Sequence, residues 1–337
     1  MPYINDLIDP QQLVGFARDQ VFPEFRLNLL LPDVTDFDLE YRFNKGALLD
    51  QDAAQYRAFD TPAGIGKRQG VTRMTGELPP LSKKYKLGEE DRLRLREIQS
   101  GDNDPLIDQI YDDVANGVRS VRARLELARG SAIYDGKVTI AENGVVADVN
   151  FGMPAGHKVT AATLWSDPAA PIIADLTAWV EVFVATNGFP PELALTSQKV
   201  FNNMLRNTQI RTLAATVAGV PAIVGRGTLS QVLVEYGLPP IEINDELIQV
   251  GGVATRPIPE NRFVMLAPNG LGRTIFGVTA EALRQVRNGV ILKEQTPGLM
   301  AVISETDDPV GTWTKTSGIA LPVVPNPQQV LTATVIA

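Results

Sequence analysis

Residues 104–129 read DPLIDQIYDDVANGVRSVRARLELAR and predict one long amphipathic helix. Pro105 suits the first turn after an Asp104 N-cap, and Gly130 is the residue type that commonly follows the end of a helix. Apolar side chains recur at spacings of three and four: Ile107, Ile110, Tyr111, Val114, Val118, Val121 and Leu125. Because an isolated helix of this kind is only marginally stable, the stripe needs a partner surface.

Charged side chains divide the same helix into two halves. Asp108, Asp112 and Asp113 lie in the N-terminal half, and Arg119, Arg122, Arg124 and Arg129 lie in the C-terminal half. This order complements the helix dipole at the two ends. As candidate contacts between molecules we take Asp108, Asp112, Asp113, Arg119 and Arg122.

The chain before this helix is predicted to be extended. Residues 1–45 form an arm with a short helix at 11–20 and a strand at 36–43, and residues 46–88 form a long loop. The loop region carries six basic residues: Lys67, Arg68, Arg73, Lys83, Lys84 and Lys86. They form either a solvated basic loop or an interface with an acidic surface on a neighbour, for which the acidic half of the long helix is one candidate. We favour the interface, because glycine-rich chain needs external contacts to become ordered.

The remaining chain is predicted to contribute three parts: residues 89–164 with the long helix and a hairpin, residues 165–287 with mixed helix and strand patterns, and residues 288–337 with strands. The hairpin spans 131–152, with Asn143-Gly144 as its two-residue turn. Helices are expected at 172–187 and 198–206. The last strands would return to the sheet that begins near Val138, which would make the first structural region discontinuous.

The composition is that of an ordinary folded protein: 337 residues, of which 44% are hydrophobic and 21% charged. The formal net charge of −8 argues against sequence-specific reading of DNA or RNA, which usually needs a basic excess. The chain has no cysteine and one histidine, His157, so thiolate sites and sites with two imidazoles are excluded within one chain. The N-terminus lacks the pattern of a signal peptide, and residues 172–185 are too short and too charged to span a bilayer. We therefore expect a soluble cytoplasmic protein without membrane contact.

Motifs for catalysis or cofactor binding are sparse. No P-loop occurs, and residues 270–277 (GLGRTIFG) resemble half a dinucleotide fingerprint, which we interpret as a turn between strands. Asp307 and Asp308 precede Pro309 and could bind a cation, but paired carboxylates in such a turn are more often solvated. We expect no enzyme activity, no cofactor and no metal, and we keep Asp307 and Asp308 as candidate interface residues.

The order of these parts resembles the major capsid proteins of tailed bacteriophages, and most closely the lambda-type major head protein family. The stretches that carry the resemblance are 132–137 (AIYDGK), 262–268 (RFVMLAP), 272–277 (GRTIFG) and the tail from 297–300 (PGLM) through Asp307-Asp308-Pro309 to Leu321-Pro322. Their common order spans most of the chain.

The resemblance implies an α+β class and an HK97-like capsid fold. In that fold, residues 1–45 correspond to an N-terminal arm, 46–88 to the extended loop, 104–129 to the spine helix, 131–155 and 290–337 to the sheet of a peripheral domain, and 165–287 to an axial domain. The implied function is structural: pentamers and hexamers of the chain assemble into an icosahedral shell that encloses double-stranded DNA.

The same resemblance implies partners and a location. The partners are further copies of the chain, a separate scaffolding protein, a portal and, as in some relatives, a decoration protein, with packaged DNA nearby but not read specifically. The implied location is the virion capsid, after assembly in the host cytoplasm. Some relatives join subunits by a lysine–asparagine bond; Lys67 is a candidate donor, but no asparagine partner matches, and no cross-link is predicted.

Other functions stay open at this point. An encapsulin-like nanocompartment would use the same fold around enzyme cargo. A metal-dependent hydrolase would use Asp307, Asp308 and His157. A phage tail-tube or sheath protein fits the order of arm and long helix poorly.

Overall fold

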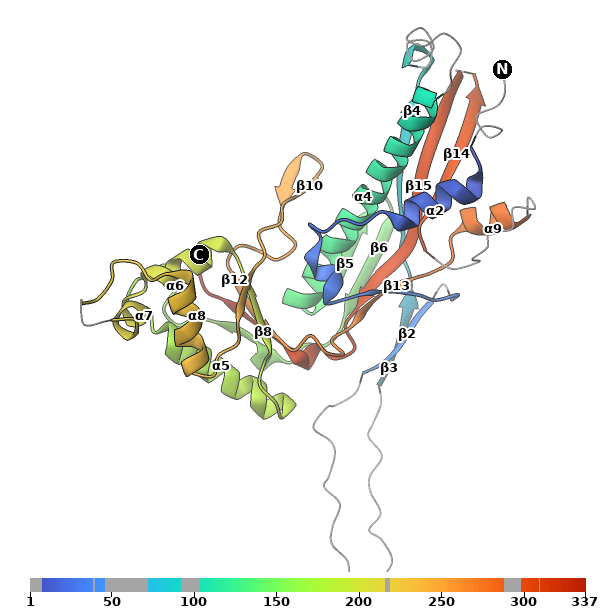
Figure 1. The fold of residues 1–337 in the computed structure, drawn as a ribbon. Coiled ribbons are helices and arrows are strands. Elements are labelled where there is room, and N and C mark those ends of the chain that lie inside the picture. The colour runs from blue at the N-terminus through green and yellow to red at the C-terminus, as the bar shows by residue number, and fades with distance from the viewer. Residues whose placement is uncertain are drawn as a thin grey trace, which may run out of the picture. The chain divides into compact units, whose positions relative to one another are not determined.

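A computed structural model describes residues 8–38, 40–45, 72–91, 104–215, 219–287, 298–308 and 310–337 (Figure 1). The chain divides into two compact units, each assembled from separate stretches of sequence. The first unit comprises Met1–Tyr41, Thr75–Arg129 and Arg273–Val323, and the second comprises Arg42–Met74, Gly130–Gly272 and Val324–Ala337. Both units contain helices and sheets, as an α+β class requires.

The predicted long helix is confirmed, but it is longer than expected. Helix α4 spans Asp104–Tyr134, 31 residues, so Gly130 lies inside it instead of ending it. A Cβ atom at Gly130 would lie 2.1 Å from the carbonyl oxygen of Pro257, which shows that this glycine permits close packing. The helix is instead followed by Gly136, whose φ of 63° suits only glycine well. The first residues of the range predicted for the hairpin, 131–134, therefore belong to α4, and the first strand of the hairpin begins at Lys137.

The first unit is built on a five-stranded sheet. Its strands are β1 (Asp33–Thr35), β13 (Arg273–Phe276), β15 (Val310–Val323), β14 (Met300–Asp307) and β4 (Pro80–Leu87). The long strand β15 pairs antiparallel with β14, β4 and β13, and β1 pairs parallel with β13. Figure 1 shows α4 running alongside β15 and β4. This sheet supplies the partner surface that the apolar stripe of α4 needs.

The buried face of α4 follows the predicted stripe. Ile110, Val114, Val118, Val121 and Leu125 are at most 3% exposed. They share a hydrophobic cluster with Phe276, Ala301 and Ala320 from the sheet, with Leu299 just before β14, and with Leu13 and Ala17 from helix α2 (Pro10–Asp19). The helix approaches the sheet closely at Gly117, where a Cβ atom would lie 2.3 Å from the hydroxyl oxygen of Thr316.

The N-terminal arm is packed on its own unit over the part that the structure describes. Helix α2, the short 3-10 helix η1 (Arg26–Leu29) and strand β1 all belong to the first unit. Leu27 and Leu31 are at most 1% exposed. Residues 46–71 of the predicted loop lie outside the described residues, and they are flanked by the paired strands β2 (Glu40–Lys45) and β3 (Thr72–Glu77). Strand β2 is the strand that was expected at 36–43, and it begins four residues later than expected, at Glu40.

The second unit is built on another five-stranded sheet, in the order β7-β16-β12-β8-β9. Its strands are β7 (Lys158–Thr160), β16 (Val330–Thr334), β12 (Arg262–Leu266), β8 (Leu193–Thr196) and β9 (Ile241–Ile243). Four helices accompany it: α5 (Ile172–Asn187), α6 (Gln198–Arg206), α7 (Thr208–Leu213) and α8 (Arg226–Glu235). The helices predicted at 172–187 and 198–206 are confirmed, and Gly188 follows α5 with a φ of 79°.

One strand lies in a different sheet from the one expected. Residues 330–336 were expected to return with the tail to the sheet near Val138, but β16 pairs with β12 and β7 in the second unit. The reason is burial on both faces, because Val330, Leu331 and Ala333 are each 0% exposed. A strand that is apolar on both sides needs an interior position in a sheet with both faces covered.

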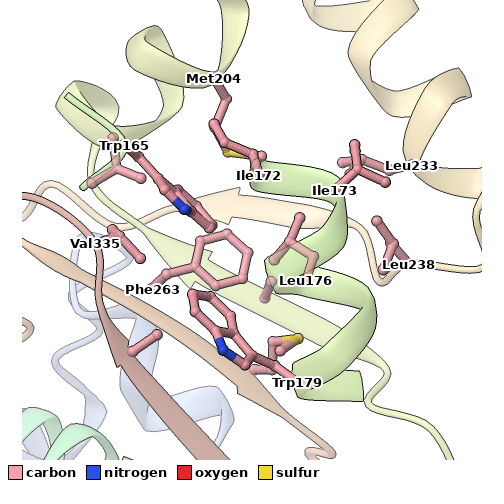
Figure 2. Packing of buried hydrophobic residues seen from close by; sticks show 14 of the residues in the cluster. Trp165, Ile172, Ile173, Leu176, Trp179, Met204, Leu233, Leu238, Phe263 and Val335 are labelled. Carbon is pink, nitrogen blue, oxygen red and sulfur yellow. The ribbon is translucent and has the colours of Figure 1, made fainter. Parts of the chain in front are cut away.

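The core of the second unit is formed around two tryptophans (Figure 2). The rings of Trp165 and Trp179 are stacked with their centroids 5.6 Å apart, and Phe263 of β12 meets Trp165 edge-on at 5.2 Å. Ile172, Ile173 and Leu176 of α5 point into the same cluster, as the helical pattern predicts. The indole nitrogen of Trp165 donates a hydrogen bond to Asp175 at 3.0 Å, so its one polar atom is satisfied.

Two hairpins and several short elements complete the described chain. Strands β5 (Lys137–Glu142) and β6 (Val145–Asn150) form the predicted hairpin, and Asn143 and Gly144 both have positive φ, as the two-residue turn requires. The hairpin is a separate two-stranded sheet, so the expectation that it joins the tail strands was wrong. Strands β10 (Ile248–Val250) and β11 (Val253–Thr255) form a second hairpin that the sequence patterns did not predict. The others are η2 (Ala155–His157), η3 (Pro327–Gln329) and α9 (Ala280–Arg287).

Candidate functional site

The acidic half of α4 presents part of its charge to solvent. Asp108 and Asp112 are exposed, whereas Asp113 is half-buried and accepts a hydrogen bond from Gln109 Nε2 at 3.3 Å. Burial raises the pKa of Asp113 above its ordinary value, and the nearby charge of Asp112 adds to this effect against the Gln109 hydrogen bond. The raised pKa of Asp113 therefore comes first from burial, with the neighbouring carboxylate as the smaller cause.

The predicted basic residues do not all lie in a loop. Lys83, Lys84 and Lys86 lie in β4, which pairs with β15 from Pro80 to Leu87. Lys67 and Arg68 lie outside the described residues, and Arg73 lies in β3 with its side chain outside them. Sequence patterns had joined these residues into one segment because pairing with a strand more than 220 positions away is not visible locally.

Lys84 and Lys86 form a defined arrangement on one face of the sheet. Tyr85, between them, contacts Ser120 of α4 at 3.4 Å, so alternation along the strand directs both lysines to the face away from α4. The ammonium nitrogens of Lys84 and Lys86 lie 3.7 and 5.4 Å from the ring centroid of Trp313. The indole ring fixes two exposed positive charges, which suits recognition of anionic groups.

Lys315 belongs to the same face of β15 but is engaged within the chain. Its Nζ lies 2.5 Å from Glu281 Oε1 of α9. Burial alone would raise the pKa of Glu281, but the hydrogen bond and the charge of Lys315 outweigh burial and hold this pKa below its ordinary value. The basic charge that this face exposes without an acidic partner of the kind Lys315 has therefore comes from Lys84 and Lys86 on Trp313.

The two arginines proposed as interface residues have partners within the first unit. Arg119 pairs with Glu24 at 2.7 Å, with both side chains exposed. Arg122 pairs with Asp33 of β1, and both side chains are largely buried. Arg122 therefore joins the N-terminal arm to α4, and any role for it between copies would be indirect.

Sequence patterns missed a buried ionic network next to Arg122. Arg129 is 1% exposed and contacts three groups: Glu126 Oε2 at 3.0 Å, Asp33 Oδ1 at 2.7 Å and the Thr274 hydroxyl at 2.9 Å. Glu126 is 0% exposed and accepts a further bond from the backbone N–H of Leu27 at 2.6 Å. The sequence contained a signal for this buried network. Arg129 follows Leu125 by four residues and so continues the apolar stripe of the helix.

Asp307 and Asp308 end strand β14 and begin its turn to β15. Asp307 is opposite Val310 in the register, and Asp308 is exposed. Within the described ranges, no group of three or more histidine, cysteine, aspartate or glutamate residues is arranged to hold a metal ion. The residues proposed for a hydrolase therefore do not form a recognisable metal centre in this part of the chain.

His157 is a structural residue of the second unit. It is 1% exposed; its Nδ1 lies 2.8 Å from the carbonyl oxygen of Val330, its Nε2 lies 3.0 Å from the Thr186 hydroxyl, and its ring stacks on Phe183. Burial lowers the pKa of His157, although the hydrogen bond to Val330 partly opposes this shift. Since both ring nitrogens are engaged, the proposed role as a metal ligand or base is contradicted.

The second unit is expected to lose stability as the pH falls from 7 to 5. Because the pKa of His157 is lowered in the folded chain, the unfolded chain, with its ordinary value of 6.5, takes up the proton first. The stability that the folded chain gains from a neutral His157 is fully present above pH 6.5. Below pH 6.5 this stability is lost, by at most about 1.4 kcal/mol per pH unit. The measurement is the urea midpoint of the dissociated chain against pH, for wild type and His157→Gln. The variant removes the only imidazole, so equal slopes in both proteins would contradict this prediction.

The sequence profile of one family matches most of this chain. The family is described as phage major capsid protein E, and the match covers residues 44–335. No curated protein matches the sequence. Across the described part of the chain, no helix combines the length and the apolar character needed to cross a bilayer.

Solved structures of phage origin share the fold over nearly the whole chain. A protein described as a prophage capsid protein from E. coli CFT073 is 16% identical and covers 98% of this chain and 99% of its own, with a TM-score of 0.63. A phage-related protein from Bordetella bronchiseptica RB50 is 13% identical, with a TM-score of 0.60. The match covers 97% of this chain and 96% of that protein. The mature capsid protein of bacteriophage PhiM1 is 13% identical, with a TM-score of 0.52. The match covers 94% of this chain and 87% of that protein.

These comparisons confirm the expected HK97-like fold and the resemblance to phage major capsid proteins. The family is a structural capsid protein family. The chain is a capsid component of a phage particle and belongs to the phage major capsid protein E family.

Proposed function

We propose that this protein forms pentamers and hexamers that tile an icosahedral shell around double-stranded DNA. The observation that carries the proposal is the match of the phage major capsid protein E family to residues 44–335. The fold shared with phage capsid structures supports it over nearly the full chain. An encapsulin-like compartment is the weaker alternative, because the matching family is a phage capsid family.

Contacts between copies are proposed to be electrostatic in part. The basic residues Lys67 and Arg68 of one copy would face the acidic half of α4 in a neighbour, where Asp108 and Asp112 are exposed. Single exposed ion pairs contribute only ~0–1 kcal/mol, so the stability of the shell would come from repetition of such contacts around each capsomer.

The proposed partners follow from this function. A separate scaffolding protein would guide assembly in the host cytoplasm, a portal would occupy one vertex, and a decoration protein would add to the finished shell. Packaged DNA would lie close to the shell without being read, since a chain with a net charge of −8 has no basic excess for specific recognition. The lysines on Trp313 offer a local positive surface within this acidic chain.

The test of the proposed function is the particle itself. The full chain, expressed alone and together with a scaffolding protein from the same genome, is expected to sediment as shells with capsomers visible by electron microscopy. Genes for terminase and portal beside the coding sequence would favour the virus, whereas a gene for an enzyme cargo would favour a compartment. A chain that stays monomeric under all these conditions would overturn the proposal.

A charge-exchange series tests the proposed contact between copies. Lys67→Glu with Arg68→Glu, and separately Asp108→Lys with Asp112→Lys, should each lower the assembled fraction about tenfold, equivalent to ~1.4 kcal/mol per subunit. All four substitutions together should restore assembly, because the attraction returns with exchanged signs. The control is Glu181→Lys with Glu235→Lys, two exposed acidic residues of the second unit. Failure of the fourfold variant to recover while the control assembles normally would rule out this pairing.

A further inference from the structure

The second unit presents a short two-stranded ribbon formed by residues 245–256, which include β10 and β11. The two strands pair only with each other among the residues that the structure describes. A two-stranded hairpin is at best marginally stable in water unless something else covers it. The ribbon therefore needs either support at its base or a partner along its length.

Support at the base is visible in the contacts of the flanking residues. Asp245 and Arg256 form an ion pair across the two ends of the ribbon, and Asp245 Oδ2 also accepts the backbone N–H of Gln198 at 3.1 Å. Arg256 lies 3.7 Å from Glu260, which in turn pairs with Lys199 at 3.0 Å. These bonds fix the direction in which the ribbon leaves the unit.

The tip of the ribbon is a tight two-residue turn. Gly251 and Gly252 form the turn with φ values of 57° and 85°, and neither would have a neighbour within 4 Å of an added Cβ atom. Two consecutive positive φ values are typical of the tight hairpin turn that matches the twist of paired strands. The ribbon thus ends in a tight two-glycine turn with open space around both Cβ positions.

The ribbon exposes apolar side chains along this projection. Ile248 at its base is 7% exposed, but Val253, on the same face near the tip, is 66% exposed, and Leu247 on the opposite face is 60% exposed. All three residues of β11 are exposed. An apolar face that begins in the core and continues into solvent is typical of a surface that a partner covers.

The charge of the ribbon indicates which partner this is. Residues 247–255 read LIQVGGVAT and contain no charged residue, in a chain that is 21% charged and has a net charge of −8. Two copies of such a chain carry the same net negative charge, so an uncharged projection is where they approach at the lowest electrostatic cost. A nucleic acid or another acidic partner would instead select for lysine or arginine at the tip.

We propose that the 245–256 ribbon docks on a neighbouring copy of this chain, covering Val253 and adding contacts along the outer edge of β11. This inference rests on the proposed shell function and names one of its contacts between copies. Strand addition at β11 would supply backbone hydrogen bonds, and Val253 would supply the apolar anchor. The partner is a second copy, not the scaffold, the portal or DNA.

A charge placed at the tip tests this contact. Val253→Asp is expected to lower the fraction of chain in sedimenting particles about tenfold relative to wild type, while circular dichroism and solubility stay unchanged. Val146→Asp is the matched control, because Val146 is 84% exposed near the turn of another two-stranded hairpin, β5–β6. Wild-type assembly by Val253→Asp, or an equal loss in both variants, would overturn the inference.

A photo-crosslink gives an independent reading. Since the chain has no cysteine, Val253→Cys introduces the only thiol, and a benzophenone maleimide attached to it can be irradiated in assembled particles. The expected product is a chain of doubled mass, with the adduct mapped to a surface of a second copy by mass spectrometry. Adducts only within one chain would overturn the inference while leaving the shell function intact. If the wild-type chain forms no particle at all, the proposed function fails and the ribbon contact fails with it.

Discussion

Replacing Arg129 with alanine is expected to destabilise the first unit by about 3–5 kcal/mol, the cost of leaving a buried charge without its partner. The guanidinium of Arg129 contacts Glu126, Asp33 and Thr274, and its side chain is 1% exposed. Without it, the fully buried carboxylate of Glu126 loses its ion pair with the guanidinium. The arm residues 27–36 should detach first, because Asp33 loses one of its two arginines.

Two measurements on the dissociated chain test this expectation. Urea unfolding should show the lower stability, and hydrogen exchange should speed up at the amides of Leu27 and Asp36, which bond to Glu126 and to the Phe276 carbonyl. The matched control is Arg119→Ala, which breaks the exposed pair with Glu24 and should cost ~0–1 kcal/mol. Similar unfolding midpoints for the two variants would show that the buried network contributes no more than a surface pair.

Replacing Gly130 with alanine should destabilise the second unit by ~1–3 kcal/mol, although alanine is the better helix former. An added Cβ atom would lie 2.1, 2.4 and 2.8 Å from the O, C and Cα atoms of Pro257. These are backbone atoms, so no side-chain rotation can relieve the clash. Either α4 or the segment at Pro257 must move.

Gly15 provides a control inside another helix of the same chain. It lies in α2 with no atom within 4 Å of an added Cβ, so Gly15→Ala should stabilise the protein by about 1 kcal/mol. The measurement is the thermal unfolding midpoint of the two dissociated variants against wild type. A gain in both variants would mean that the contact at Pro257 yields easily, and it would contradict the close packing described for α4.

Local patterns in the sequence predicted the elements whose signals lie within a few residues. Helix α6 follows Ser197, which caps it by accepting the N–H of Val200, and α5 is followed by Gly188; both helices have the predicted range. The β5–β6 turn at Asn143-Gly144 was predicted on the same basis. In each case one short motif marks where an element starts or ends. The same motif also sets the direction in which the next element runs.

Long-range contacts decided the elements that were misassigned. Gly130 has the local signature of a helix end, and only its contact with Pro257 explains why the helix continues. Strand β16 joins β12 because both lie in the buried interior of the second sheet. The lysines of β4 are held by pairing with β15, and the buried Glu126–Arg129 pair becomes visible only when Asp33 and Thr274 are placed beside it.

The parallel pairing of β1 with β13 has a consequence for synthesis. Thr274 donates its hydroxyl to the carbonyl of Leu31, 243 positions earlier, and Asp33 lies opposite Thr274 in the register. Strand β1 therefore cannot pair with β13 until most of the remaining chain has been translated. Long-range pairing of this kind is slow. A product that ends before residue 273 lacks β13, β14 and β15 and cannot close the first sheet. Only full-length chains would then join a growing particle, so the connectivity of the fold itself excludes truncated chains from assembly.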